Sequence, residues 1–134
     1  TLAFGLLLGI AIAWLTSAYW PGRPRIRSPL AILEYAAVVL YDILVSNLQV
    51  AYLVLFRRGA SLKSQFVTVP LDLKSPEAIA TLAGTITMTP GTVSADLSAD
   101  GRSLLVHCLE TTDHAGTVAA IKSRYERRLM RIFE

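Results

Sequence analysis

Hydrophobic and polar positions divide the chain into two parts of different character. Residues 1–20 are uncharged and mostly apolar. A helix of that length, rising about 1.5 Å per residue, covers about 30 Å, the thickness of the hydrocarbon core of a bilayer. Tyr19 and Trp20 lie at the end of this segment, where aromatic side chains commonly sit at the level of the lipid headgroups, and Pro21 ends the helix. The pattern predicts a membrane-spanning helix.

Three arginines follow this segment at positions 23, 25 and 27. Cytosolic flanks of membrane helices are enriched in Lys and Arg, so Arg23, Arg25 and Arg27 indicate a cytosolic, lipid-facing end. The alternative is a secretory signal peptide, since Thr16 and Ala18 are small enough for a cleavage site, but no basic stretch precedes the apolar run. Because the chain starts inside a hydrophobic stretch and without Met, we expect further sequence before it.

A second apolar segment, residues 30–56, is long enough to span a bilayer with tilt. At about 100° per residue, its polar stripe occupies about one third of the helix circumference and consists of Glu34, Tyr41, Asp42, Gln49 and Tyr52. Insertion free energies do not decide its placement. Each large apolar side chain contributes about −0.3 to −0.6 kcal/mol, whereas one central Asp costs about +3 kcal/mol.

Basic residues flank this second segment on both sides, with Arg57, Arg58 and Lys63 behind it. The positive-inside tendency therefore puts both ends in the cytosol, which a single spanning helix cannot satisfy. Two placements stay open. Either the helix lies along the cytosolic interface with its polar stripe toward water, and Arg57 and Arg58 face lipid headgroups, or it spans and packs its carboxylates against other transmembrane helices.

Glu34 and Asp42 are the acidic residues of this segment. We expect both either on the wet face of an interfacial helix or in ion pairs with a neighbouring subunit. The alternative is that Asp42 lines a cation or proton path, because ionisable groups within membrane helices commonly mark such paths. The helix itself carries no cationic partner for either carboxylate.

From Phe66 the pattern changes from helical to alternating. A strand is predicted whose inward face carries Val67, Val69, Leu71 and Leu73, and Pro70 marks it as an edge strand because it lacks an amide donor. Residues 75–77, Ser-Pro-Glu, combine an N-cap, a proline at the first helical position and an acid in the first turn. A helix follows, which ends before the turn at Pro90.

The remaining residues predict two strands and a last helix. The first of these strands buries Val93, Ala95 and Leu97; after a hairpin turn at residues 99–101, the second buries Leu104, Val106 and Cys108. Asp113 caps a last helix that reaches Ile132. The fold class is therefore an α+β membrane protein, with membrane-embedded or interfacial helices in residues 1–60 and a small cytosolic β-α-β-β-α domain in residues 61–134.

Composition narrows the chemistry. One cysteine in 134 residues excludes an internal disulfide and a four-cysteine zinc cage. A net charge of +3 is too small and too unevenly distributed to indicate a nucleic-acid-binding surface. His107, Glu110, Asp113 and His114 match no known metal-ligand spacing, because the first lies on a strand and the last two begin a helix. We expect no metal, no other cofactor and no nucleic-acid partner. Cys108 is expected to be a small, buried hydrophobic residue.

Residues 84–92 are rich in hydroxyl groups but lack the Gly-Lys-Ser/Thr ending of a phosphate loop, and they follow a helix rather than a strand. They are expected to form a helix end that runs into a turn. No convergent set of titrating groups can be assembled from the chain, so we expect that it is not an enzyme.

Several of these segments together resemble a known family. Residues 82–92, LAGTITMTPGT, with the later Asp-Gly at 100–101 and Leu-Val-His at 105–107, are similar to the E subunit of the multisubunit Mrp (also Mnh or Pha) cation/proton antiporters. The closing Ile-Lys-Ser-Arg-Tyr-Glu at 121–126 and the spacing from Asp42 to Asn47 are similar too. Thr-Pro-Gly-Thr is the most specific element. Gly84 and Met88 stand where the family is expected to have Asn and Leu, so no role of that Asn is carried over.

The resemblance implies a multi-pass protein of the bacterial inner membrane whose C-terminal domain is cytosolic. Its partners would be the lipid bilayer and the other hydrophobic subunits of a Na⁺(K⁺)/H⁺ antiporter. Exchange in that family is attributed to large subunits, so this chain would be an accessory subunit that supports assembly and exchange without a catalytic centre. The alternative is a freestanding, membrane-tethered binding module that recognises a cytosolic ligand or anionic lipid through residues 122–131.

Overall fold

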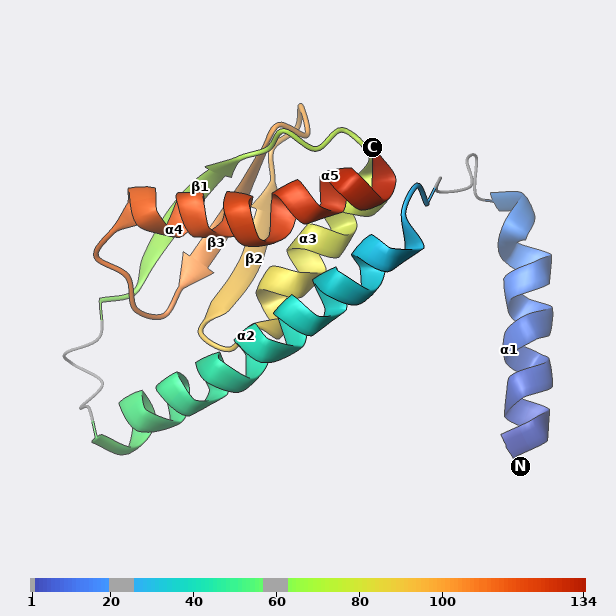
Figure 1. Ribbon diagram of the computed structural model, residues 1–134, viewed down its shortest axis with the longest axis horizontal. Helices are drawn as coiled ribbons and strands as arrows, with labels where there is room; N and C mark the ends of the chain where they lie inside the picture. Colours follow the sequence, from blue (N-terminus) through green and yellow to red (C-terminus); the bar gives the residue numbers. More distant parts are fainter. Residues whose placement is uncertain (1, 20–25, 57–62) are drawn as a thin grey trace.

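The computed structural model describes residues 2–19, 26–56 and 63–134. Two helical segments come first: α1 (Leu2–Thr16), continued by the short 3₁₀ helix η1 (Ser17–Tyr19), and α2 (Pro29–Phe56). The elements that follow are β1 (Gln65–Pro70), α3 (Pro76–Met88), β2 (Thr92–Leu97), β3 (Ser103–Cys108), α4 (His114–Ile121), the π-helical turn η3 (Lys122–Glu126) and α5 (Arg127–Phe133) (Figure 1).

Both N-terminal helical segments are long and apolar enough to cross a membrane by length and composition. No residue of α1 is buried. A helix that is apolar on all sides and exposed on all sides needs lipid or protein around it. The second segment is different, because Ala31, Tyr35 and Val39 of α2 are buried.

The three predicted strands are present, and within the described residues they form one antiparallel sheet of strand order β1-β3-β2. β1 lies at an edge, as its terminal Pro70 predicted. Cross-strand partners share a face, so Val67 opposite Val106 and Val69 opposite Leu104 form one buried layer. The helices α3 and α5 cover that layer, and Leu82 and Leu129 belong to the same buried cluster.

The predicted face of β2 is wrong. Val93 and Leu97 are 49% and 42% exposed, although the alternation placed them inward. Val93 pairs with His107, whose neighbours in β3 are the buried residues, so Val93 lies on the open face of the sheet. The inward position belongs to Ser94, whose hydroxyl donates to the Ala83 carbonyl at 3.0 Å. An irregularity between Ser94 and Asp96 shifts the register after that point.

The predicted helix starts are confirmed. Ser75 accepts a hydrogen bond from the Ala78 amide at 3.1 Å, and Asp113 accepts one from the Gly116 amide at 2.9 Å. The last helix differs from a regular one, because the π-helical turn η3 separates α4 from α5.

The core extends across the boundary that composition suggested near residue 60. Ala31, Tyr35 and Val39 of α2 belong to the same buried cluster as the sheet and the helices after it. Figure 1 shows α2 running alongside α3 and α5, with the sheet on the other side of those helices. Helix α2 is therefore a layer of the C-terminal fold as well as an apolar rod.

Candidate functional site

Two residues of the polar stripe of α2, Asp42 and Glu34, pair with side chains of η3 and α5. The Arg124 guanidinium binds the Asp42 carboxylate through Nε, 2.9 Å from Oδ2, and through Nη2, which contacts Oδ1. The Tyr125 hydroxyl donates to the same Oδ2 at 2.9 Å. This two-point pairing and the added phenol hydrogen bond are the geometry in which Arg and a carboxylate bind most strongly.

Glu34 is bound in a similar way, by two arginines of α5, the element that follows η3. Arg128 Nε lies 3.0 Å from Oε1 and Arg131 Nη1 lies 3.0 Å from Oε2. We call the residues of the Asp42 and Glu34 pairings together the α2–α5 seam; they are Glu34, Asp42, Arg124, Tyr125, Arg128 and Arg131. The seam joins residues about 80 to 100 positions apart in the chain, so its pairing could not be read from any single helix.

At the Asp42 end of the seam, the surroundings favour a protonated Arg124 and a neutral Tyr125 phenol. The hydrogen bond to Asp42 raises the pKa of Arg124, against the opposing effect of burial. Burial, together with the hydrogen bond to Asp42, raises the pKa of Tyr125 to about 12. The side chain of Asp42 is only 12% exposed. The Asp42 end of the seam is thus a partly buried ion pair with a neutral phenol attached.

A neutral contact joins α2 to α3 beside the seam. The hydroxyl oxygens of Tyr35 and Thr85 lie 2.6 Å apart and are buried. The Tyr35 ring also meets the Tyr125 ring edge-on, with centroids 6.5 Å apart. Hydrophobic and hydrogen-bonding contacts therefore reinforce the ion pairs.

The hydroxyl-rich segment closes the end of α3, as the sequence predicted. Thr89 and Thr92 donate to the carbonyls of Thr85 and Ile86 at 2.9 Å and 2.7 Å. These hydroxyls satisfy carbonyls that a helix end leaves without partners. Gly91 has a φ of +91°, and a Cβ added there would meet Val50 of α2 at 3.4 Å. The second half of α2 therefore packs beside the Thr-Pro-Gly-Thr turn.

Glu126 is an important residue that the sequence predictions missed. It is 1% exposed, and its carboxylate accepts hydrogen bonds from the amides of Asp72 and Leu73 at 2.6 Å and 3.2 Å. Lys122 pairs with the same carboxylate at 2.7 Å. Burial opposes the charge of Lys122, but its hydrogen bonds to Asp72 and Glu126 raise its pKa. The only sequence signal was the i,i+4 spacing of Lys122 and Glu126.

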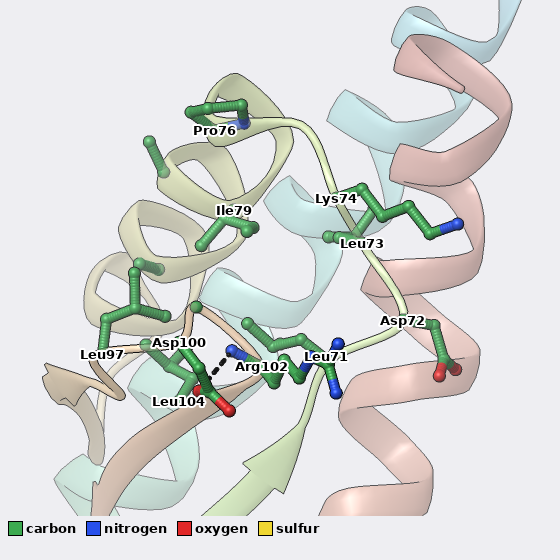
Figure 2. Close-up of a pocket in the computed structure, with 13 residues that line it drawn as sticks. Leu71, Asp72, Leu73, Lys74, Pro76, Ile79, Leu97, Asp100, Arg102 and Leu104 are labelled. Atoms are coloured by element: carbon green, nitrogen blue, oxygen red, sulfur yellow. Dashed lines mark hydrogen bonds between the residues drawn. The ribbon is translucent and has the colours of Figure 1, made fainter.

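A surface pocket of about 890 Å³ lies between α3, the β2–β3 hairpin and the segment after β1 (Figure 2). Its floor is apolar, with Leu71, Ile79 and Leu104 among the lining residues. Its charged groups do not converge: Asp72 pairs with Lys122 at 2.8 Å, and Asp100 accepts from the Arg102 amide within the hairpin turn. The lining residues therefore form no cluster of acids and bases aimed at a common point.

The remaining predicted site residues fall in different places. Arg27 is exposed, and its amide donates to the Ile132 carbonyl at 2.8 Å. Arg23, Arg25, Arg57 and Arg58 lie outside the described residues. Within the described ranges, no group of three or more His, Cys, Asp or Glu side chains could hold a metal ion. Cys108 is buried, and burial raises the pKa of its thiol.

Comparison with known proteins gives a consistent result. A family model described as "Na+/H+ ion antiporter subunit" matches residues 1–132. The E subunit of a probable K⁺/H⁺ antiporter from Rhizobium meliloti is 31% identical over 134 residues, which cover 100% of this chain and 83% of that protein. The E1 subunit of a Na⁺/H⁺ antiporter from Staphylococcus haemolyticus is also 31% identical, over 99% of this chain and 83% of its own length.

Two solved structures are similar as well. A chain of the membrane-bound sulfane sulfur reductase, an archaeal respiratory membrane complex, aligns with a TM-score of 0.75 and 26% identity, covering 99% of this chain and 84% of that one. A chain of the Mrp complex from Dietzia sp. DQ12-45-1b shares the fold, with a TM-score of 0.58, 22% identity and coverage of 80% of this chain and 100% of that one. Since the family model matches nearly the whole sequence, the chain belongs to the family of Na⁺/H⁺ ion antiporter subunits.

Proposed function

We propose that this chain is an accessory subunit of a multisubunit monovalent cation/proton antiporter in a bacterial inner membrane. It supports assembly and exchange through helix packing and a cytosolic α/β domain, and the exchange itself belongs to other hydrophobic subunits. The observation that carries the proposal is the α2–α5 seam, in which arginines of the same chain neutralise both carboxylates of α2.

This pairing bears on the ion-path hypothesis for Asp42. A carboxylate that conducts protons or cations must release and rebind charge. Asp42 instead has an arginine on both oxygens and a phenol on one, so each change of its charge would disrupt three hydrogen bonds. We infer that Asp42 and Glu34 hold α2 against the C-terminal domain.

The relatives support the choice of partners. Their names describe subunits of Na⁺/H⁺ and K⁺/H⁺ antiporters, and the similar solved chains come from a respiratory membrane complex and an Mrp complex. The other hydrophobic subunits of such a complex and the surrounding lipid are therefore the proposed partners. The freestanding module is less well supported, because Arg124, Arg128 and Arg131, which would contact its ligand, are occupied within the seam.

The test uses the complete complex in inverted membrane vesicles. Deleting this subunit is expected to reduce both the amount of assembled complex and cation-driven proton exchange. With the subunit present, Asp42→Asn is expected to reduce assembled complex severalfold, because Arg124 loses its charged partner at a partly buried position. Exchange per assembled complex is expected to stay within about twofold, because the pair is structural. The double variant Asp42→Arg with Arg124→Asp restores the pair and is expected to recover part of the assembly.

Two results would contradict the proposal. One is normal assembly of Asp42→Asn with loss of exchange and no recovery in the double variant, which would assign the carboxylate to an ion path. The other is purification of the native chain as a solitary monomer without hydrophobic partners, which would favour the freestanding binding module.

A further inference from the structure

The side of α2 opposite the seam has an unusual composition. Counting in steps of three and four residues, it presents only leucine and alanine, at Leu30, Leu33, Ala37, Leu40, Leu44, Leu48, Ala51 and Leu55. All six leucines are 58–78% exposed. We call these eight positions the Leu/Ala stripe. It follows the helix for about 37 Å at about 1.5 Å per residue, with no polar side chain in it.

The seam side of the same helix is occupied over most of its length. Tyr35 and Val39 are buried against the core, and Asp42 is paired with Arg124. Further along, Val50 and Leu53 lie beside the Thr-Pro-Gly-Thr turn, where they line a shallow pocket with it. Helix α2 and the α/β domain are therefore in contact side by side, from the first turns of the helix to near its end.

This side-by-side packing is incompatible with α2 crossing a bilayer. A crossing helix would carry the attached domain into the hydrocarbon, including Arg124 and Arg131, whose side chains are 46% and 59% exposed. Charged side chains at that depth cost several kcal/mol each. A helix parallel to the surface avoids this cost, because it puts the seam and the domain on the water side.

We propose that α2 lies in the plane of the membrane, with the Leu/Ala stripe immersed at the boundary between lipid headgroups and acyl chains. The occupant of the stripe is lipid for two reasons. The helix follows α1 closely in the chain, and α1 is uncharged, exposed on every side, and long and apolar enough to cross a bilayer. The described cationic residues beyond each end of α2, Arg27 and Lys63, are both exposed and suit anionic headgroups.

The inference rests on the proposed function only in requiring a membrane. It assigns α2 a depth and an orientation, whereas the proposed function concerns assembly and exchange. The two therefore fail separately: a complex that exchanges ions normally could still carry a spanning α2, and an inactive complex could still carry an in-plane one.

The test measures depth with nitroxide labels on the complete complex in liposomes that contain anionic lipid. Single cysteines replace Leu33, Leu40, Leu48 or Leu55, and the milder changes Ala37→Cys and Ala51→Cys serve where a leucine replacement reduces assembly. Cys108 is buried, so the unmodified chain measures background labelling. Relative accessibility to oxygen and to a water-soluble nickel chelate gives the depth of each label. Labels at Leu6 and Ile10 in α1 are the matched control.

The expected result is one common depth, within a few Å, for all labels on the stripe. Labels at Leu6 and Ile10 should instead differ in depth by about 1.5 Å per residue of a spanning helix. A steady depth gradient along α2 would overturn the inference, because it means that the helix spans. High nickel accessibility at every stripe position, which means water, would also overturn it. So would low accessibility to both reagents, which means that another subunit covers the stripe.

Discussion

At the scale of single residues, the seam shows why charges on an apolar helix are tolerated. Asp42 and Arg124 satisfy each other with two contacts, and Tyr125 satisfies a remaining lone pair. Breaking such a pair from one side is costly, because it leaves the other charge partly buried and unpaired. Glu34 is 43% exposed and is shared between two arginines, so each of its contacts contributes less.

The seam predicts an alkaline loss of stability that depends on Tyr125. Its pKa is about 12 in the folded chain against 10.0 for an ordinary tyrosine. A group whose pKa is raised by folding stabilises the fold fully below its unfolded pKa, and that stabilisation is lost as the pH rises through the folded pKa. The window is therefore pH 10 to about 12, and the loss amounts to at most about 2–3 kcal/mol.

The measurement is thermal unfolding in detergent across this pH window for the native chain and for Tyr125→Phe. The variant starts from a lower stability, because it lacks the hydrogen bond to Asp42, but its stability should fall less between pH 10 and 12. The pKa of Lys122 is also raised in the folded chain. Both proteins contain this lysine, so it contributes equally to the pH dependence of their stabilities. Parallel curves for the two proteins would show that the phenol of Tyr125 is not the titrating group.

At the scale of elements, the end of α3 does two tasks at once. Its hydroxyls bind the last carbonyls of the helix, and its turn supports α2. Gly91 makes the turn possible, because its φ of +91° is a backbone conformation that side chains disfavour. The most specific sequence motif of the chain is therefore a packing device in the described structure.

Replacing Gly91 with Ala is expected to destabilise the fold by about 1–2 kcal/mol, since the new methyl group strains the backbone and meets Val50. The matched control is Gly84→Ala, in the interior of α3, where an added Cβ has open space. That change should stabilise by about 0.5–1 kcal/mol, because alanine favours helix. Thermal unfolding of both variants measures the difference, and equal effects would contradict the role given to Gly91.

At the scale of the whole molecule, α2 belongs to two environments. One side completes the core of the α/β unit and the other carries the Leu/Ala stripe. The unit after residue 61 is small, and a small domain has little apolar surface to bury by itself. We therefore expect α2 to be needed for the stability of the C-terminal fold.

Two fragments in detergent test this expectation. Residues 26–134 keep α2 and should unfold cooperatively, whereas residues 63–134 lack it and should unfold at a clearly lower temperature or remain unfolded. The physical reason is the loss of cover from Tyr35 and Val39, at about 1.5–3 kcal/mol for each buried apolar side chain. Circular dichroism on heating compares them. Equal stability of the two fragments would show that residues 63–134 form an independent domain.

The sequence by itself determined the local features of this chain. Apolar runs, helix caps at Ser75 and Asp113, the edge proline and the hairpin turn depend on neighbours a few residues away, so their patterns are visible along the chain. The family could be recognised for a similar reason, because its motif is a contiguous segment that builds one helix end and one turn.

Only the tertiary structure decided which distant groups meet. The partners of Glu34 and Asp42, the buried position of Glu126 and the inward side of β2 each depend on residues far apart in the sequence. Periodicity gives the spacing of side chains around an element, but not which face a neighbouring element covers. For that reason the polar stripe of α2 could be found from the sequence. Only the packed fold showed which arginines pair with it and that the opposite Leu/Ala stripe stays exposed.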